Sequence, residues 1–134
     1  MNKRREMLQV AYAAQWNAAG IDAILCPANA SVASAHGESK YWGYSSVFNV
    51  LDYSGATFPV GMVEEVDTWD SQPRINDLSP EDTFFRQAYT GPEKYSRAPV
   101  NLQLVTRRFG EEKLLLMVDQ VLECLEKDVP SLKA

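Results

Sequence analysis

One stretch of the sequence decides the fold: APVNLQLVTRRFGEEKLLL, from Ala98 to Leu116. It predicts a strand over Val100–Val105, in which Leu102 and Leu104 face one side and Asn101, Gln103 and Val105 face the other. A basic turn, Arg107-Arg108, comes next, and a closing helix is predicted from about Glu111. The apolar stripe of that helix consists of Leu114, Val118, Val121 and Leu125, widened by Leu115 and Leu122.

The rest of the chain alternates between helix and strand signals. Helices are predicted over residues 2–19, 41–53 and 79–88, and strands over residues 23–26 and 58–63. The first helix has its apolar residues at helical spacing: Met7, Val10, Ala11, Ala14 and Ala18. Gly20 and Gly55 are predicted to end the first two helices, and Ser79 to cap the third. Residues 64–77 are acidic and polar, which is typical of a surface excursion.

This order predicts a three-layer α/β fold, with a mixed sheet of about three strands covered by helices. At 134 residues, the chain is predicted to form a single domain over residues 1–134. Hydrophobic residues at 46% and charged residues at 23% indicate a globular chain with a core. The net charge of -5 argues against a nucleic-acid partner.

Neither a membrane span nor a secretory leader is predicted. No apolar run reaches the roughly 18 residues that a spanning helix needs. The start of the chain, Met1–Arg5, imitates the basic region of a signal peptide, but Gln9 and Gln15 interrupt the apolar run after it. We therefore expect a cytoplasmic protein.

Few residues suit a metal or a cofactor. Cys26 and Cys124 lie far apart in apolar contexts and are predicted to be buried free thiols. With His36 as the single histidine, no zinc spacing is recognisable. No phosphate-binding glycine loop or dinucleotide motif is present, so we expect no metal and no cofactor.

Candidate catalytic groups occur in three places. Ser39-Lys40 imitates a serine–lysine pair, but adjacent residues do not face each other on a helix. Ser45-Ser46 imitates a nucleophile turn, but its neighbours are not the glycines that an oxyanion hole needs. An acidic run contains Glu64, Glu65, Asp67 and Asp70, and is interpreted as a solvated face because a polar loop cannot split two carboxyl pKa values by burial.

Four stretches in the same order resemble the amidase signature family, in particular its fungal acetamidase-like and fatty acid amide hydrolase-like branches. They are IDAILCP (residues 21–27), YSSVFNVLDYSG (44–55), FPVG (58–61) and the segment 99–116. The resemblance covers residues 4–127 and implies the C-terminal portion of that fold only. It departs from the family pattern at Asn101 and Thr106, where the family usually has glycine.

The resemblance implies amide hydrolysis by a serine–serine–lysine arrangement, in which lysine is the base, one serine relays the proton and a second serine attacks the carbonyl. None of these catalytic motifs can be placed on this chain, so no catalytic residue is predicted. What the resemblance transfers is a substrate-pocket wall of Cys26, Pro27, Trp42 and Tyr44. Ordinary packing is the alternative role for these four residues.

The sequence supports three functional hypotheses. In the first, the chain is a segment of an amidohydrolase whose full-length form binds a small amide substrate. In the second, it is a non-catalytic, truncated amidase-like module acting in binding or assembly. In the third, an unrelated enzyme site is built around His36. Because a piece of a larger sheet exposes strand edges and apolar helix faces, we also expect self-association into an oligomer or contact with a missing N-terminal part.

Overall fold

A computed structural model describes residues 3–68 and 79–128 of the chain. The predicted alternation of helices and strands is confirmed, element by element and in the predicted order. The elements are α1 (Lys3–Ala19), β1 (Ile24–Pro27), α2 (Gly43–Leu51), β2 (Ser54–Met62), α3 (Pro80–Ala88), β3 (Pro99–Thr106) and α4 (Glu111–Asp128).

The three strands form one sheet in the order β1-β3-β2, which is antiparallel throughout. The α/β class, the three strands and their helical cover are as predicted, but the expectation of a mixed sheet is wrong. Because β1 and β2 both run antiparallel to β3, they are parallel to each other without being neighbours. Strand β3, the last in sequence, enters between them, and no local sequence signal shows this insertion.

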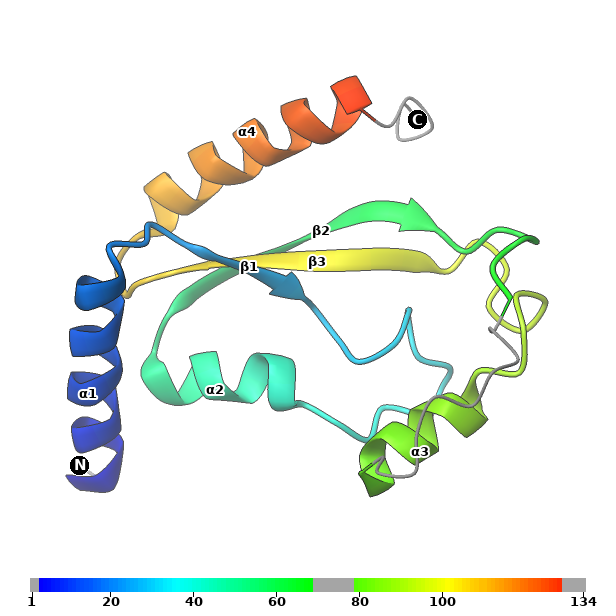
Figure 1. Cartoon of the computed structure of the whole chain (residues 1–134), viewed down its shortest axis with the longest axis horizontal. Coiled ribbons are helices and arrows are strands. Elements are labelled where there is room, and N and C mark those ends of the chain that lie inside the picture. The colour runs from blue at the N-terminus through cyan, green and yellow to red at the C-terminus, as the bar shows by residue number, and fades with distance from the viewer. Residues whose placement is uncertain (1–2, 69–78, 129–134) are drawn as a thin grey trace.

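Helices cover both faces of the sheet (Figure 1). Val105 packs with Phe48 and Leu51 of α2 on one face, whereas Leu104 packs with Phe58 and Leu114 on the face covered by α4. The predicted alternation of β3 is therefore confirmed, and its end is buried on both sides. Pro59 lies on an edge strand, as its missing N–H requires.

Helix α1 buries a different face from the predicted one. Met7 and Val10 are 72% and 71% exposed, and Ala11, Ala14 and Ala18 are exposed as well. The helix instead packs through Trp16 and Tyr12, whose rings meet the Tyr53 ring edge-on at 5.4 and 5.9 Å. Aromatic residues bury more area than alanine and methionine at the contact, so they determine the orientation of the helix.

Helix α4 follows its predicted stripe except at Leu115. That side chain is 62% exposed, and Met117 takes a place on the buried face. The inward residues are Leu114, Met117, Val118, Val121, Leu122 and Leu125. Both cysteines are free thiols, as predicted. The predicted burial is wrong, because Cys124 is exposed and Cys26 is half-buried.

Helix α2 ends earlier than predicted, and β2 starts earlier. Asp52 adopts the left-handed conformation (φ 62°) and caps the helix, while Gly55 belongs to β2 opposite Val105. The residues Ser54–Ala56 have little strand propensity, and they are extended because they pair with β3. Gly20 has a φ of +62° and Ser79 caps α3, both as predicted.

The acidic stretch is described only in part. Glu64, Glu65 and Asp67 are exposed, whereas Asp70 and the rest of residues 69–77 lie outside the described residues. Within the described ranges, no helix has both the length and the apolar character needed to cross a membrane.

The turn from β3 into α4 is tightly packed. Thr106 is 2% exposed, and a Cβ added to Gly110 would lie 2.9 Å from both the Thr106 Oγ1 and the Arg107 carbonyl oxygen. We expect Gly110→Ala to lower the free energy of unfolding by about 1–3 kcal/mol, because the carbonyl belongs to the backbone and cannot move away cheaply. Gly61→Ala is the matched control, since a Cβ there meets nothing within 4 Å. Urea denaturation checks both, and equal midpoints for the two variants would contradict the packing argument.

Candidate functional site

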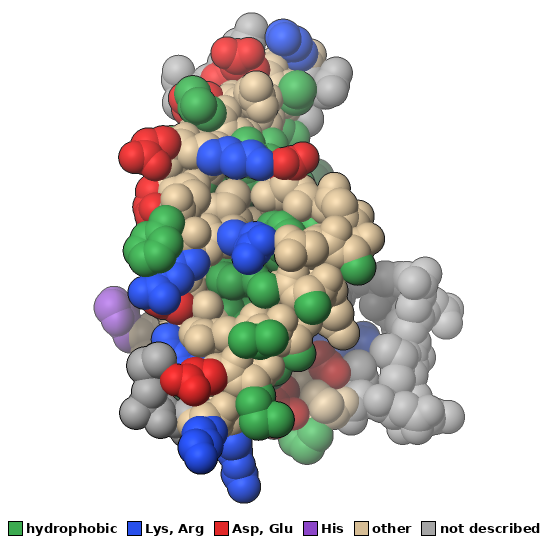
Figure 2. Space-filling model, turned by 90° about the vertical axis from the view of Figure 1, so that its left-hand side faces the viewer, with side chains coloured by type: hydrophobic (Ala, Val, Ile, Leu, Met, Phe, Trp, Pro, Cys, Tyr) green, Lys and Arg blue, Asp and Glu red, His purple; other side chains and the backbone are tan. Residues whose placement is uncertain are grey.

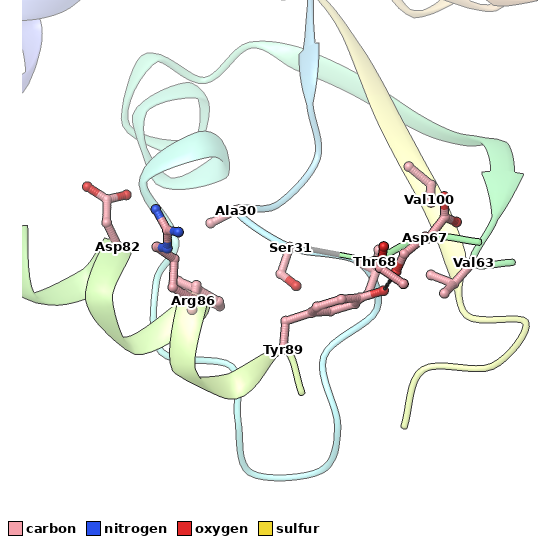
Figure 3. Close-up of a pocket in the computed structure, with 11 residues that line it drawn as sticks. Ala30, Ser31, Val63, Asp67, Thr68, Asp82, Arg86, Tyr89 and Val100 are labelled. Carbon is pink, nitrogen blue, oxygen red and sulfur yellow. Dashed lines mark hydrogen bonds between the residues drawn. The ribbon is translucent and has the colours of Figure 1, made fainter. Parts of the chain in front are cut away.

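A hollow of about 510 Å³ lies between α3 and the sheet (Figure 3). Apolar side chains form much of its wall: Val32, Val63, Phe85 and Val100. Ser31, Thr68, Asp67, Asp82 and Arg86 add polar groups. A partly apolar cavity of this size with a few polar groups is typical of a small-molecule site.

Helix α3 is positioned by caps at its start and by tyrosine contacts at its end. Ser79 and Asp82 form a reciprocal capping box, so the first turn has its backbone donors satisfied. At the other end, the Tyr89 hydroxyl donates to the Asp67 carbonyl oxygen at 2.7 Å, and the Tyr89 ring stacks on Tyr95 at 5.2 Å. Figure 3 shows Tyr89 reaching across the hollow from α3 towards Asp67 and Thr68.

The loop after β1 forms the opposite wall and is tied to the segment after α3. Lys94 Nζ lies 2.8 Å from Glu38 Oε1, and the Tyr95 hydroxyl also donates to this carboxylate at 3.2 Å. The hydrogen bond and charge of Lys94 lower the pKa of Glu38. Glu38 is therefore held as a carboxylate that fixes the loop, and it is unsuited to act as a general acid near neutral pH.

The four predicted wall residues lie at the two ends of that loop. Cys26 packs against the α2 face of the core, and Pro27 is the last residue of β1. Trp42 is the residue before α2 and is 62% exposed, while Tyr44 lies in the first turn and packs edge-on against Tyr41. The loop between them supplies Ala30, Ser31 and Val32 to the hollow. The assignment of these four side chains as a substrate-pocket wall stays a prediction.

Gln103 joins the two ends of the loop, and sequence reasoning did not assign it a role. Its side chain is buried, and Nε2 donates to the Pro27 carbonyl oxygen at 3.0 Å and to the Tyr44 carbonyl oxygen at 2.7 Å. The one signal in the sequence is a polar residue at an inward position, on the same face of the strand as Val105. A buried amide at such a position requires partners.

The serines and cations that imitate catalytic groups lie in ordinary local structure. Ser45 Oγ donates to the Trp42 carbonyl oxygen at 3.3 Å, as residues at a helix start commonly do. Ser39, Lys40 and His36 are exposed. In the part of the chain that the structure describes, no group of three or more His, Cys, Asp or Glu side chains could hold a metal ion.

A three-stranded sheet with helices on both faces defines the class as α/β. The family model described as Amidase matches residues 1–115, and the chain belongs to that family. The predicted family is thereby confirmed.

Relatives and a solved structure agree with this assignment. An acetamidase of Aspergillus oryzae is 35% identical over 103 residues, covering 75% of this chain and 18% of that protein. Amidase 1 of Gibberella moniliformis is 35% identical over 135 residues, covering 93% of this chain and 25% of that protein. A fatty acid amide hydrolase structure superposes with a TM-score of 0.82 at 26% identity, covering 91% of this chain and 22% of that one.

The chain thus spans about a fifth of the length of the curated relatives that it matches. The predicted C-terminal portion of the amidase fold fits this coverage.

The Gln103 bridge yields a stability prediction. Gln103→Leu keeps the approximate size of the side chain but leaves the Pro27 and Tyr44 carbonyls without their donor, so we expect a loss of about 1–3 kcal/mol. Gln87→Leu is the matched control, because Gln87 is exposed on α3 and its replacement should stay within about 0.5 kcal/mol. Urea denaturation of both variants is the measurement. A Gln103→Leu protein as stable as the parent would show that the bridge is dispensable.

Proposed function

We propose that this chain is the C-terminal segment of an amidohydrolase that cleaves carbon–nitrogen bonds of amides by serine nucleophilic catalysis. The observation that carries the proposal is the family match over residues 1–115. The names of the relatives, among them acetamidase and fatty acid amide hydrolase, support a small or acyl amide as the substrate class. The full-length protein would be the active species, in the cytoplasm and without a nucleic-acid partner.

In this proposal the chain contributes binding surface and no reacting group. The nucleophile, the bridging serine and the lysine base come from the part of an amidase that precedes this segment. Cys26, Pro27, Trp42 and Tyr44 then form part of the wall around the acyl group. Their place at the ends of one loop supports a common role, since Gln103 ties both ends to the central strand.

An assay of the 134-residue chain alone tests the claim that it supplies binding surface but no reacting group. With acetamide and a longer acyl amide as substrates, we expect no turnover above the uncatalysed rate, and no stoichiometric serine labelling by an acylating inhibitor. Fusing or adding the upstream part of the enzyme should restore turnover. Restoration would favour the amidohydrolase segment over a truncated binding module.

Robust hydrolysis by the chain alone would refute the claim that it lacks a nucleophile. Ser45→Ala, Ser46→Ala and Lys40→Ala would then locate the reacting group. His36→Ala serves as the test of a site around the histidine, because unchanged activity removes that hypothesis.

A further inference from the structure

The outer face of α1 combines apolar side chains with a basic end. Met7, Val10, Ala11, Ala14 and Ala18 are all exposed and recur on one side of the helix. Lys3, Arg4 and Arg5 occupy its first turn. Figure 2 looks onto the α1 side of the molecule and shows hydrophobic side chains interspersed with Lys and Arg. Singly exposed apolar residues are ordinary, but a whole helix stripe is typical of an interface.

The turn between β3 and α4 continues this surface. Arg107 Nη1 donates to Asn17 Oδ1 of α1 at 2.8 Å, which fixes the turn against the helix. Phe109 is 77% exposed, and the Arg108 guanidinium lies over its ring at 4.5 Å. We call the exposed stripe of α1 together with Arg107, Arg108 and Phe109 the α1–turn face. Arginine and aromatic residues are the types enriched in protein interfaces.

A hollow of about 230 Å³ lies within this face. Val10 and Ala13 of α1 line one side, and Arg107 and Arg108 line the other. Tyr53 also borders it, and its phenol lies close enough to Arg107 for the guanidinium to act on it. Burial raises the pKa of the Tyr53 phenol, and the nearby Arg107 guanidinium partly opposes this shift. The Arg107 guanidinium has five N–H donors, more than its contacts with Asn17 and Tyr53 require.

We infer that the α1–turn face is the surface through which this segment docks onto the remaining amidase domain, with an acidic side chain of that domain in the hollow beside Arg107. The inference rests on the proposed function. The chain spans about a fifth of the length of its relatives, so in the proposed full-length enzyme the other four-fifths would be available to cover this face. A carboxylate there would accept hydrogen bonds from the Arg107 guanidinium and from the Tyr53 hydroxyl.

The charge of the face opposes a second copy as the occupant. A two-fold contact places a surface patch against the same patch of its partner. Lys3, Arg107 and Arg108 would then meet their own counterparts, and like charges across an interface are unfavourable. Glu6 in the first turn of α1 and Asp52, which pairs with Arg108 at 2.9 Å, offset part of this charge.

Cysteine labelling tests the docking directly. The probe is a chimera in which this chain replaces the matching segment of the Aspergillus oryzae acetamidase, in a Cys124→Ser background. Val10→Cys reports on the α1–turn face, and Thr83→Cys, exposed on α3, is the control. Both thiols should react rapidly with a maleimide in the isolated chain. In the chimera we expect Val10→Cys to react at least about tenfold more slowly and Thr83→Cys to be unchanged, since burial excludes the reagent.

The outcomes separate this inference from the proposed function. A chimera in which Val10→Cys is protected but which has no amidase activity would support the docking and contradict the proposed function. A chimera in which Val10→Cys stays as reactive as in the isolated chain, or one that never assembles, overturns the docking. In the isolated chain, protection of Val10→Cys that increases with protein concentration would identify a second copy as the occupant. That result would also overturn the docking inference. Arg107→Glu should weaken the protection, whereas Arg107→Lys should retain part of it.

Discussion

The structure depends on the position of β3 at the centre of the sheet. It pairs with β1 on one side and β2 on the other, and its end is buried against α2 on one face and α4 on the other. Val105 is 0% exposed and Leu104 is 3% exposed, so two adjacent residues belong to opposite cores. Strand β3, the sixth of the seven described elements, therefore completes the core on both faces of the sheet. Until it is inserted, β1 and β2 have no partner in the described part of the chain, and neither core is closed.

Gln103 adds a polar constraint to this apolar arrangement. A buried amide gives little net stability, but it is costly when unpaired, so its two bonds select one geometry for the loop ends at Pro27 and Tyr44. That geometry also sets where Ala30 and Ser31 approach the hollow beside α3. The core thereby positions a loop that carries side chains of both polar and apolar character, which is how a rigid scaffold commonly presents a binding site.

The sequence predicted what local pattern controls and failed where tertiary contact decides. Periodicity placed all seven elements, and the Ser79 cap and the left-handed Gly20 were predictable from backbone chemistry. It misjudged the inward face of α1, because ring packing of Trp16 on Tyr53 outweighs a stripe of alanines. It also missed that β2 begins at Ser54, since pairing with β3 makes those residues extended. In the site, the resemblance suggested the wall residues Cys26, Pro27, Trp42 and Tyr44. The roles of Gln103 and Tyr89 depend on contacts between segments far apart in sequence, which no local pattern shows.

The error on α1 is itself informative. An apolar stripe in a sequence is typical of a helix face that packs against another element. In this chain α1 has two such faces: an aromatic face that its own core covers, and the stripe of Met7, Val10 and Ala14 that remains exposed. A helix inside a larger domain is expected to be apolar on more than one side, because neighbours contact it from several directions. Under the docking proposal, the pattern that misled the fold prediction is the one expected of a helix that lies within a larger domain.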